Sequence, residues 1–480
     1  MVASDRTKWF ALALLCAVQF MVVLDIAIVN VALPSIQVDL GFSQQNLQWV
    51  ISAYALAFGG FLLLGGRTAD LVGRRRVFVG GTILFALGSL LCGFAWSEES
   101  LIGARALQGL GAAAITPAAL AILVTTFSEG RERNIALGAW GAVGGFGAAA
   151  GVLFGGILTD LLSWEWIFFI NVPVALLALV LTPVLLSESR DARAQGFDVP
   201  GAVLVTAGLS VLVLGVTQGR DWGWSSALTI GVFAAAAALL VAFVVWEQRV
   251  RDPLVPFSIF RLQTLTAANV SGFILGTALF AMFLMLTLYM QLVLGYSPIK
   301  TGLAYLAVAG TAVIWANVAA VAVNRVGVKP ALIFGMTLLT IGLVYFTQVS
   351  VGGSYWTDLF PGFLIIGLAI PFAFVPISIA AFAGTRNHEA GLASGLMNTS
   401  QQIGGAVGIA ILSTIATSTT TDAISTGTQM PVALTDGFQA AFWAGAGIAV
   451  VGMLVSIFLV RGRDLQPVEV PVVEPLAEAA

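Results

Sequence analysis

The stretch GGRTADLVGRRR at residues 65–76 lies between two apolar segments, at 48–65 and 77–96, and contains four arginines. Each flanking segment has about 20 residues, the number that a helix needs to cross a hydrocarbon core ~30 Å thick. Arginines are retained in the loops on the cytoplasmic side of a membrane. The stretch is therefore predicted to be a cytoplasmic loop between two transmembrane helices.

The same alternation of apolar segments and polar gaps continues along all 480 residues, of which 59% are hydrophobic and 9% charged. A soluble chain cannot hide so much apolar surface from water, so we predict an integral membrane protein. The longest outer gap, the Thr-rich 418–436, is predicted to be a loop. The predicted transmembrane segments lie near 9–33, 48–65, 77–96, 101–127, 134–158, 165–186, 199–217, 225–246, 265–292, 302–324, 330–348, 356–382, 391–417 and 437–460.

Lysine and arginine are distributed unequally between alternate gaps. Of the 21 such residues, 18 lie at the two ends or in the even-numbered gaps, two (Arg220 and Lys300) lie in odd-numbered gaps, and Arg105 lies inside a segment. Because positive residues stay in the cytoplasm, both termini are predicted to be cytoplasmic. The expected fold class is an all-α polytopic protein with 14 transmembrane helices. The excess of arginine over lysine is typical of a high-GC bacterium, which indicates a bacterial plasma (inner) membrane.

A weak internal repeat predicts how these helices are grouped. DLVGRRR begins at Asp70 and NRVGVKP at Asn324, an offset of 324 − 70 = 254 residues. Six helices with their loops need only about 190 residues, so two helices are inserted between two related halves. The predicted units are a six-helix bundle at 1–190, the inserted pair with its linkers at 191–262, a second six-helix bundle at 263–464 and a disordered tail at 465–480.

The residue types do not support several other classes of function. Cys16 and Cys92 both lie within apolar segments, so neither a disulfide framework nor a metal site is predicted. The only histidine, His388, lies in a gap, and the segments lack the Ser/His, Cys/His or paired-carboxylate sets of an enzyme. There is no basic stripe for nucleic acid. No cofactor, metal or nucleic-acid partner is therefore expected.

Two ionisable residues lie where charge is costly. Asp25 is the only acidic residue deep inside a predicted segment, and Arg105 is the only cation inside one. Asp25 lies about 24 Å along a helix that begins near Trp9, and Arg105 enters its helix from the outside to a comparable depth. An intramembrane charge of this kind is a candidate functional residue. Two interpretations remain open, a proton-exchanging pair and a static pair that holds two helices together.

The loop at 65–76 and three further segments together resemble the major facilitator superfamily, and specifically its 14-helix drug:proton antiporter family. The loop matches the pattern G-x-x-x-D-x-x-G-R-[RK]-[RK]. The resemblance implies a loop that controls conformational change through Gly66, Asp70, Gly73, Arg74 and Arg75. RALQGLGAA at 105–113 matches R-x-x-Q-G-x-G-A-A, which implicates Arg105, Gln108 and Gly109.

The other two segments are more specific for the antiporter family. LDIAIVNVALP at 24–34 resembles its first-helix signature, with Ala27 in place of threonine. GAAAGVLFGGIL at 147–158 resembles its fifth-helix signature, with Val152 in place of proline, and implies a gate between the two halves formed by Gly147, Gly151, Gly155 and Gly156. SWEWIFFINVP at 163–173 and SGLMNTSQQIGGAVG at 394–408 also follow the family.

The resemblance implies a monomeric exporter that exchanges protons for small amphipathic or aromatic compounds by alternating access, powered by the proton gradient. Asp25 and Arg105 would couple the proton, since helices 1 and 4 of the superfamily line one cavity. The missing proline leaves other forms of coupling open, and an exporter of a lipid or envelope precursor and a nutrient-uptake symporter remain alternatives. Candidate residues for the substrate cavity are Asn30, Trp140, Tyr289, Trp315 and Asn398.

Overall fold

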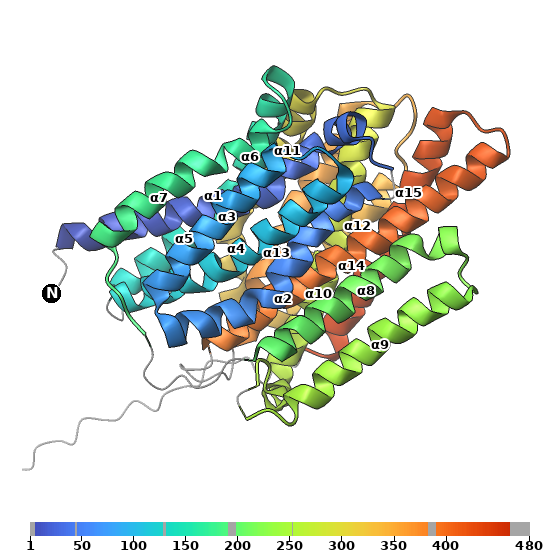
Figure 1. Cartoon of the computed structure of the whole chain (residues 1–480). Helices are drawn as coiled ribbons and strands as arrows, with labels where there is room; N and C mark the ends of the chain where they lie inside the picture. Colours follow the sequence, from blue (N-terminus) through green and yellow to red (C-terminus); the bar gives the residue numbers. More distant parts are fainter. Residues whose placement is uncertain are drawn as a thin grey trace, which may run out of the picture.

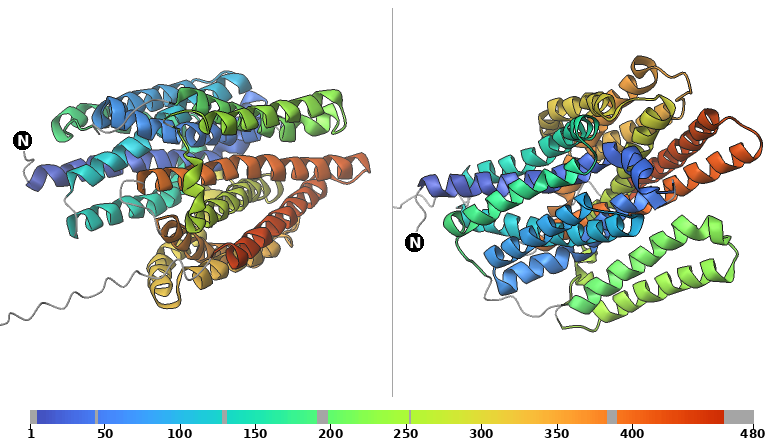
Figure 2. Two further views of the ribbon diagram at one scale, coloured as in Figure 1. Left: turned by 90° about the horizontal axis from the view of Figure 1, so that it is seen from below. Right: turned by 45° about the horizontal axis from the view of Figure 1, so that its top comes forward.

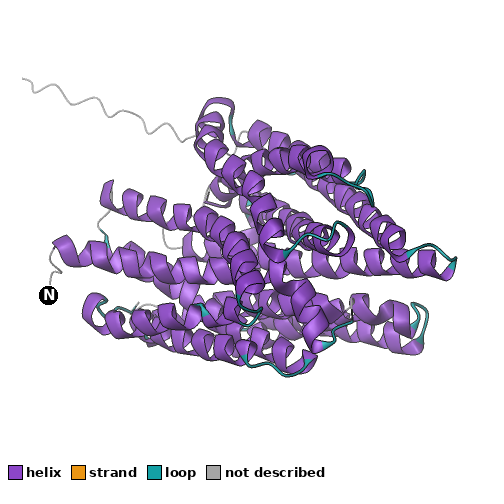
Figure 3. Ribbon diagram, turned by 90° about the horizontal axis from the view of Figure 1, so that it is seen from above, coloured by secondary structure: helices purple, strands orange, loops and turns teal. Residues whose placement is uncertain are grey.

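The computed structural model describes residues 5–43, 46–127, 131–190, 198–251, 253–382 and 390–460, and within these ranges the chain is helical without strands (Figures 1 and 3). Short helical turns at Asn46–Gln48, Phe257–Arg261, Tyr289–Val293 and Tyr355–Leu359 connect some of the long helices. The helices are α1 (Asp5–Leu40), α2 (Trp49–Val72), α3 (Arg74–Gly93), α4 (Glu98–Thr126), α5 (Arg131–Leu161), α6 (Trp166–Phe169), α7 (Asn171–Leu185), α8 (Val199–Trp222), α9 (Ala227–Glu247), α10 (Gln263–Leu288), α11 (Pro298–Val326), α12 (Val328–Phe346), α13 (Phe360–Phe382), α14 (Ala390–Ser425) and α15 (Met430–Phe458).

Thirteen helices in the described part of the chain are long and apolar enough to cross a membrane, with α6 and α7 counted as one. Helix α5 is 31 residues long, and its apolar part Ala150–Leu161 is counted separately as a shorter helix. The all-α polytopic class is therefore confirmed. The number of fourteen crossings and the cytoplasmic location of both termini remain predictions.

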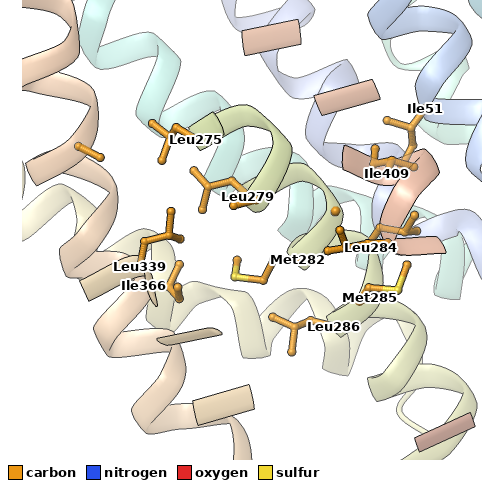
Figure 4. Packing of buried hydrophobic residues seen from close by; sticks show 14 of the residues in the cluster. Ile51, Leu275, Leu279, Met282, Leu284, Met285, Leu286, Leu339, Ile366 and Ile409 are labelled. Carbon is orange, nitrogen blue, oxygen red and sulfur yellow. The ribbon is translucent and has the colours of Figure 1, made fainter. Parts of the chain in front are cut away.

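The helices pack mainly with neighbours from their own part of the chain. Helices α2 and α3 pack on α4, and α1 packs on α5, whereas α10 packs on α14 and α15, and α12 on α13 (Figure 1). Of the thirteen spans, the one that contains α10 is the most enclosed. Its Leu279 and Met282 lie among Leu339 of α12, Ile366 of α13 and neighbouring apolar side chains (Figure 4). The first and last groups of helices meet along two seams, α2 against α14 and α5 against α11.

Small residues let the helices touch closely at both seams. In the α2–α14 seam the Thr399 hydroxyl donates to the Gly59 carbonyl at 3.1 Å. In the α5–α11 seam a Cβ at Gly156 would lie 2.6 Å from the Pro298 carbonyl oxygen, and one at Gly302 would lie 2.7 Å from that of Val152. Val152, which departs from the family pattern, therefore lies in the contact between α5 and α11.

The pair α8–α9 lies at the edge of the bundle (Figure 2). Helix α8 packs on both α2 and α14, and α9 packs on α8. The Gln48 amide donates to the Thr217 hydroxyl at 3.1 Å, and the Thr414 hydroxyl donates to the Val216 carbonyl at 3.2 Å. Helix α8 thus covers the α2–α14 seam with polar contacts to α14 and to the turn that precedes α2. The division into units at 1–190, 191–262 and 263–464 remains a prediction, and the tail at 465–480 lies outside the described residues.

Two predicted boundaries are wrong. The region 418–436 is not a loop, because α14 continues to Ser425 and α15 begins at Met430. Its threonines are compatible with helix because their hydroxyls bond to carbonyls one turn earlier, as Thr421 does to Thr417 at 2.8 Å. Helix α1 likewise continues through Pro34 to Leu40, beyond the predicted end at residue 33.

Candidate proton-coupling site

Asp25 lies in the middle of α1 with none of its surface exposed, and three side chains donate hydrogen bonds to its carboxylate. Arg105 of α4 donates through Nη1 to Oδ2 at 2.7 Å. Gln108 of α4 donates to Oδ1 at 2.7 Å, and Asn171, the first residue of α7, donates to the same oxygen at 2.8 Å. The carboxylate is therefore held as an acceptor by donors from two other helices.

Arg105 is 1% exposed, and its remaining contacts replace the water that it lacks. Its Nε donates to the Val50 carbonyl at 2.9 Å, and Nη1 also donates to the Gln108 Oε1 at 2.6 Å. The guanidinium carbon lies 4.3 Å from the centre of the Tyr54 ring. A buried ion pair is tolerated only when such additional bonds satisfy its remaining polar groups. The structure thus brings Asp25, Arg105 and Gln108 together in one network.

Two polar residues of this network were not identified from the sequence. Ser89 of α3 accepts from Gln108 at 2.9 Å and from Asn171 at 3.0 Å, and it donates to the Phe168 carbonyl of α6 at 3.0 Å. Asn171 belongs to the family motif at 163–173, and this motif could have identified it as a candidate. Ser89 offered no such signal, because isolated serines are common in membrane helices and usually bond within their own helix.

The network lies inside the bundle of α1–α4, α6 and α7, with its two charges enclosed. Close helix packing seals it, since a Cβ at Gly109 would lie 2.5 Å from the Tyr54 carbonyl oxygen. The resemblance placed Asp25 and Arg105 on helices that line a cavity. In this conformation, however, their side chains point into the bundle. A small molecule in this conformation cannot touch the carboxylate.

Three of the four motif glycines of α5 lie in its contact with α1. A Cβ at Gly147 would lie 3.1 Å from the Val23 side chain, one at Gly151 would lie 2.8 Å from the Leu24 carbonyl oxygen, and one at Gly155 would lie 2.6 Å from that of Ile28. Only Gly156 of the four faces α11. Helix α5 therefore passes directly behind Asp25 and continues to the α5–α11 seam.

The loop at 65–76 forms a tight junction between α2 and α3. Gly73 has φ of +126°, a conformation that favours glycine, and Gly66 lies where a Cβ would be 3.4 Å from Pro117. Asp70 pairs with Arg74 at 2.9 Å. The Arg75 backbone N–H donates to the Glu188 carboxylate at 3.1 Å, which ties the loop to the residues after α7.

The family model of the Major Facilitator Superfamily matches residues 15–409. The chain belongs to this superfamily. The puromycin resistance protein pur8 of Streptomyces alboniger is 40% identical over 458 residues, covering 95% of this chain and 91% of that protein. The cephamycin export protein CmcT of Amycolatopsis lactamdurans is 38% identical, covering 95% and 92%. The lincomycin resistance protein of Streptomyces lincolnensis is 34% identical, covering 85% and 84%.

Solved structures show the same fold at low sequence identity. The peptide transporter POT in complex with sulfate has a TM-score of 0.67 and 16% identity, and the match covers 95% of both chains. A bacterial homolog of the human lysosomal transporter Spinster has a TM-score of 0.66 and 14% identity, covering 96% of this chain and 98% of its own. As a member of the Major Facilitator Superfamily, this chain is a multi-pass transporter of small molecules in the bacterial inner membrane, and not an enzyme.

The five candidate cavity residues of this transporter lie on five different elements, and their role in a substrate cavity remains a prediction. Tyr289 is fully buried and donates to the Ser350 carbonyl at 2.7 Å, and Asn30 donates back to the Ile26 carbonyl of its own helix at 3.2 Å. Trp140 packs within the first bundle, Asn398 is half-buried on α14, and Trp315 is 39% exposed on α11. None of the five lines the small cavity between the turn Asn46–Gln48, α10, α14 and α15, whose wall includes Gln48, Met285 and Ser413.

Proposed function

We propose that this transporter is a proton-coupled exporter of amphipathic or aromatic compounds such as antibiotics, and that it works as a monomer by alternating access without a cofactor. The observation that carries the proposal is the Asp25–Arg105 ion pair, at 2.7 Å and at 0% and 1% exposure inside a membrane bundle. The relatives named for resistance to puromycin and export of cephamycin support the choice of cargo. The proton gradient supplies the energy.

Exchange requires that the proton and the cargo favour different arrangements of the transporter. When Asp25 binds a proton, Arg105 loses its anionic partner while it remains buried. An unpaired cation at this depth costs several kcal/mol, so the network rearranges when the proton arrives. A cargo that binds the arrangement with ionised Asp25 is then released.

The burial of Asp25 favours linked sites for proton and cargo over a single shared site. Helix α5 supplies the link, because it contacts α1 beside Asp25 through Gly151 and contacts α11 through Gly156. A shift of α1 relative to α5 therefore changes the seam between the two groups of helices. Cargo that binds between these groups responds to the proton without touching the carboxylate.

The charge of the network also limits the cargo. One carboxylate and one guanidinium cancel, so the interior has little net negative charge to offer. A dication would keep at least one positive charge without a protein partner, which is costly within the membrane. Neutral, anionic and singly charged compounds are therefore expected to be exported, and dications to be poor substrates.

Everted vesicles with an imposed pH gradient test this proposal, with ethidium as a fluorescent monocation and propidium as the related dication. Asp25→Asn is expected to abolish gradient-driven ethidium transport while the protein still reaches the membrane, and Asp25→Glu to retain part of it. Asp160→Asn, at the exposed end of α5, is the matched control and should transport normally. Undiminished transport by Asp25→Asn would refute the coupling role, and robust propidium transport would refute the charge argument.

A further inference from the structure

Asn171 occupies a special position in the network around Asp25. Its Nδ2 donates both to the Asp25 carboxylate at 2.8 Å and to the Ser89 hydroxyl at 3.0 Å. Its Oδ1 is buried and has no hydrogen-bond partner in the described part of the chain. A buried carbonyl oxygen without a donor is unfavourable, and in a native protein such a group requires an explanation.

Protonation of Asp25 supplies the donor that Asn171 Oδ1 lacks. A protonated carboxyl must donate its O–H, yet in this arrangement it faces only N–H donors. Arg105 has no acceptor atom. The Gln108 Oε1 already accepts from Arg105 at 2.6 Å and from the Cys92 thiol at 3.7 Å. Asn171 alone among the three donors has an acceptor that is not in use.

Rotation of the Asn171 amide by half a turn exchanges Oδ1 and Nδ2 in nearly the same volume. Oδ1 then accepts from the Asp25 carboxyl, and the Ser89 hydroxyl turns to donate to Oδ1 as well. This turn removes the bond from Ser89 to the Phe168 carbonyl, which measures 3.0 Å here. The proton itself stays on Asp25, and no other covalent bond forms or breaks.

The released carbonyl lies at the interruption between α6 and α7. Helix α6 ends at Phe169, Ile170 follows, and Asn171 begins α7. After the rotation, Nδ2 occupies the place where Oδ1 had no hydrogen-bond partner, and its N–H groups are left unpaired. The network with protonated Asp25 is therefore unfavourable in this conformation. The lost bond joined α3 to α6, and the unpaired Nδ2 lies at the start of α7, so both effects favour a movement of the α6–α7 junction relative to α3.

We propose that Asn171 is the positioning residue that converts protonation of Asp25 into movement at the α6–α7 junction, through Ser89 and the Phe168 carbonyl. This inference rests on the proposed proton coupling. It assigns to Asn171 two alternating roles, donor to the carboxylate and acceptor from the carboxylic acid. A residue whose role is only to fill space in the bundle would need neither the donor nor the acceptor role.

Three variants in proteoliposomes test the assignment, with ethidium as the probe. Asn171→Leu has a similar volume but neither donor nor acceptor. Asn171→Asp keeps the shape and can donate and accept only while protonated. Thr182→Val is the matched control, because Thr182 is also buried on α7 and its hydroxyl donates to the Ala178 carbonyl of its own helix. Each is assayed for gradient-driven transport, for ethidium exchange without a gradient, and for the pH dependence of ethidium binding.

Asn171→Leu is expected to lose roughly tenfold or more of gradient-driven transport while ethidium exchange is retained, because only the proton signal is removed. Loss of one donor to the carboxylate should also move the midpoint of the binding pH profile upward by about one unit. Asn171→Asp should remain coupled at low pH and lose coupling as the pH rises. Thr182→Val should change neither the ratio of the two transport modes nor the midpoint.

Two outcomes would overturn the assignment of Asn171. One is an equal fall of exchange and gradient-driven transport in Asn171→Leu, and the other is an unchanged midpoint of its pH profile. If the proposed proton coupling itself is wrong, the result differs. The pH gradient would then not change wild-type transport, or Asp25→Asn would still show gradient-driven transport. If wild type and Asp25→Asn behave as proposed, the three variants test Asn171 alone.

Discussion

The first and last groups of helices share a sequence repeat, yet their interiors differ in chemistry. With an offset of 255 residues, given by 382 − 127 for the two phenylalanines that follow α4 and end α13, Gln108 corresponds to Phe363 (108 + 255). Gln108 bonds to Asp25, Arg105 and Ser89 in a polar network. Phe363 is fully buried in an aromatic cluster, 5.3 Å from the Tyr305 ring centre and 5.7 Å from that of Phe346.

The two charged positions show the same contrast. Asp25 corresponds to Phe280 (25 + 255), and Arg105 corresponds to Phe360 (105 + 255). The first group of helices thus encloses an ionisable network, whereas phenylalanine stands at the corresponding positions of the last group. Under the proposed coupling, a proton that binds Asp25 changes the charge of the first interior, whereas these three counterparts in the last group of helices are phenylalanines. The comparison teaches that the same arrangement of helices can form around polar or aromatic side chains. A response to a proton, in contrast, requires a few polar side chains at particular positions.

The largest expected effect follows from breaking the ion pair of the polar interior. Arg105→Leu leaves the Asp25 carboxylate buried without a cation and should lower the free energy of unfolding by about 3–5 kcal/mol, seen as a fall in Tm in detergent. The double variant Asp25→Asn with Arg105→Leu should recover much of this loss, because it removes both charges. The first interior then contains no ionised group, like the aromatic interior of the last group of helices. Additive losses in the double variant would contradict this account.

The aromatic interior should be vulnerable to lost volume and insensitive to pH. Phe363→Ala removes a ring that contacts those of Tyr305, Phe346 and Tyr355, and it should cost about 3 kcal/mol of stability through the cavity that it leaves. The pH dependence of ethidium binding should stay at the wild-type midpoint. Thermal unfolding and the binding assay measure the two quantities separately. A displaced midpoint in Phe363→Ala would mean that the second half also takes part in proton coupling.

A smaller effect distinguishes the two repeated loops. Gly73 and Gly327, 254 residues apart, both have positive φ, at +126° and +91°. Alanine at either position should cost about 1–2 kcal/mol of stability for this backbone conformation. Gly73→Ala should be the worse of the two, because its Cβ would also lie 2.6 Å from a Glu188 carboxylate oxygen, whereas at Gly327 the nearest atom is 3.9 Å away. Equal losses would show that the contact with Glu188 does not matter.

The smallest stability effect is expected for Asp70→Asn, which makes the first loop resemble the second, where Asn324 occupies the position. The Asp70–Arg74 pair is partly exposed, so its loss should cost less than about 1 kcal/mol. Transport should nevertheless slow while ethidium affinity is unchanged, since the loop contacts neighbouring helices. A fall in affinity at an unchanged transport rate would show that the role of the loop is misassigned.

Much of the candidate site could be predicted from the sequence, because a charge inside an apolar segment is conspicuous. Asp25 and Arg105 were identified in this way, and the motif at 105–113 added Gln108. Ser89 was not predictable, since its role arises only where α3, α4 and α7 meet. The side-chain direction of Asp25 was also not predictable, because helix α1 is apolar on all sides and shows no periodicity that would separate an inner from an outer face.

The sequence by itself determined the membrane class, the positions of nearly all helices and the identity of the two buried charges. The physical reason is that the hydrocarbon core excludes polar and charged residues, so every departure from apolarity is visible along the chain. Only the tertiary structure decided that Asp25 is enclosed by three donors within the first bundle, and that α5 connects this network to the α5–α11 seam. Hydrogen bonds and close helix contacts depend on distances of a few ångströms between residues far apart in sequence, which no local pattern specifies.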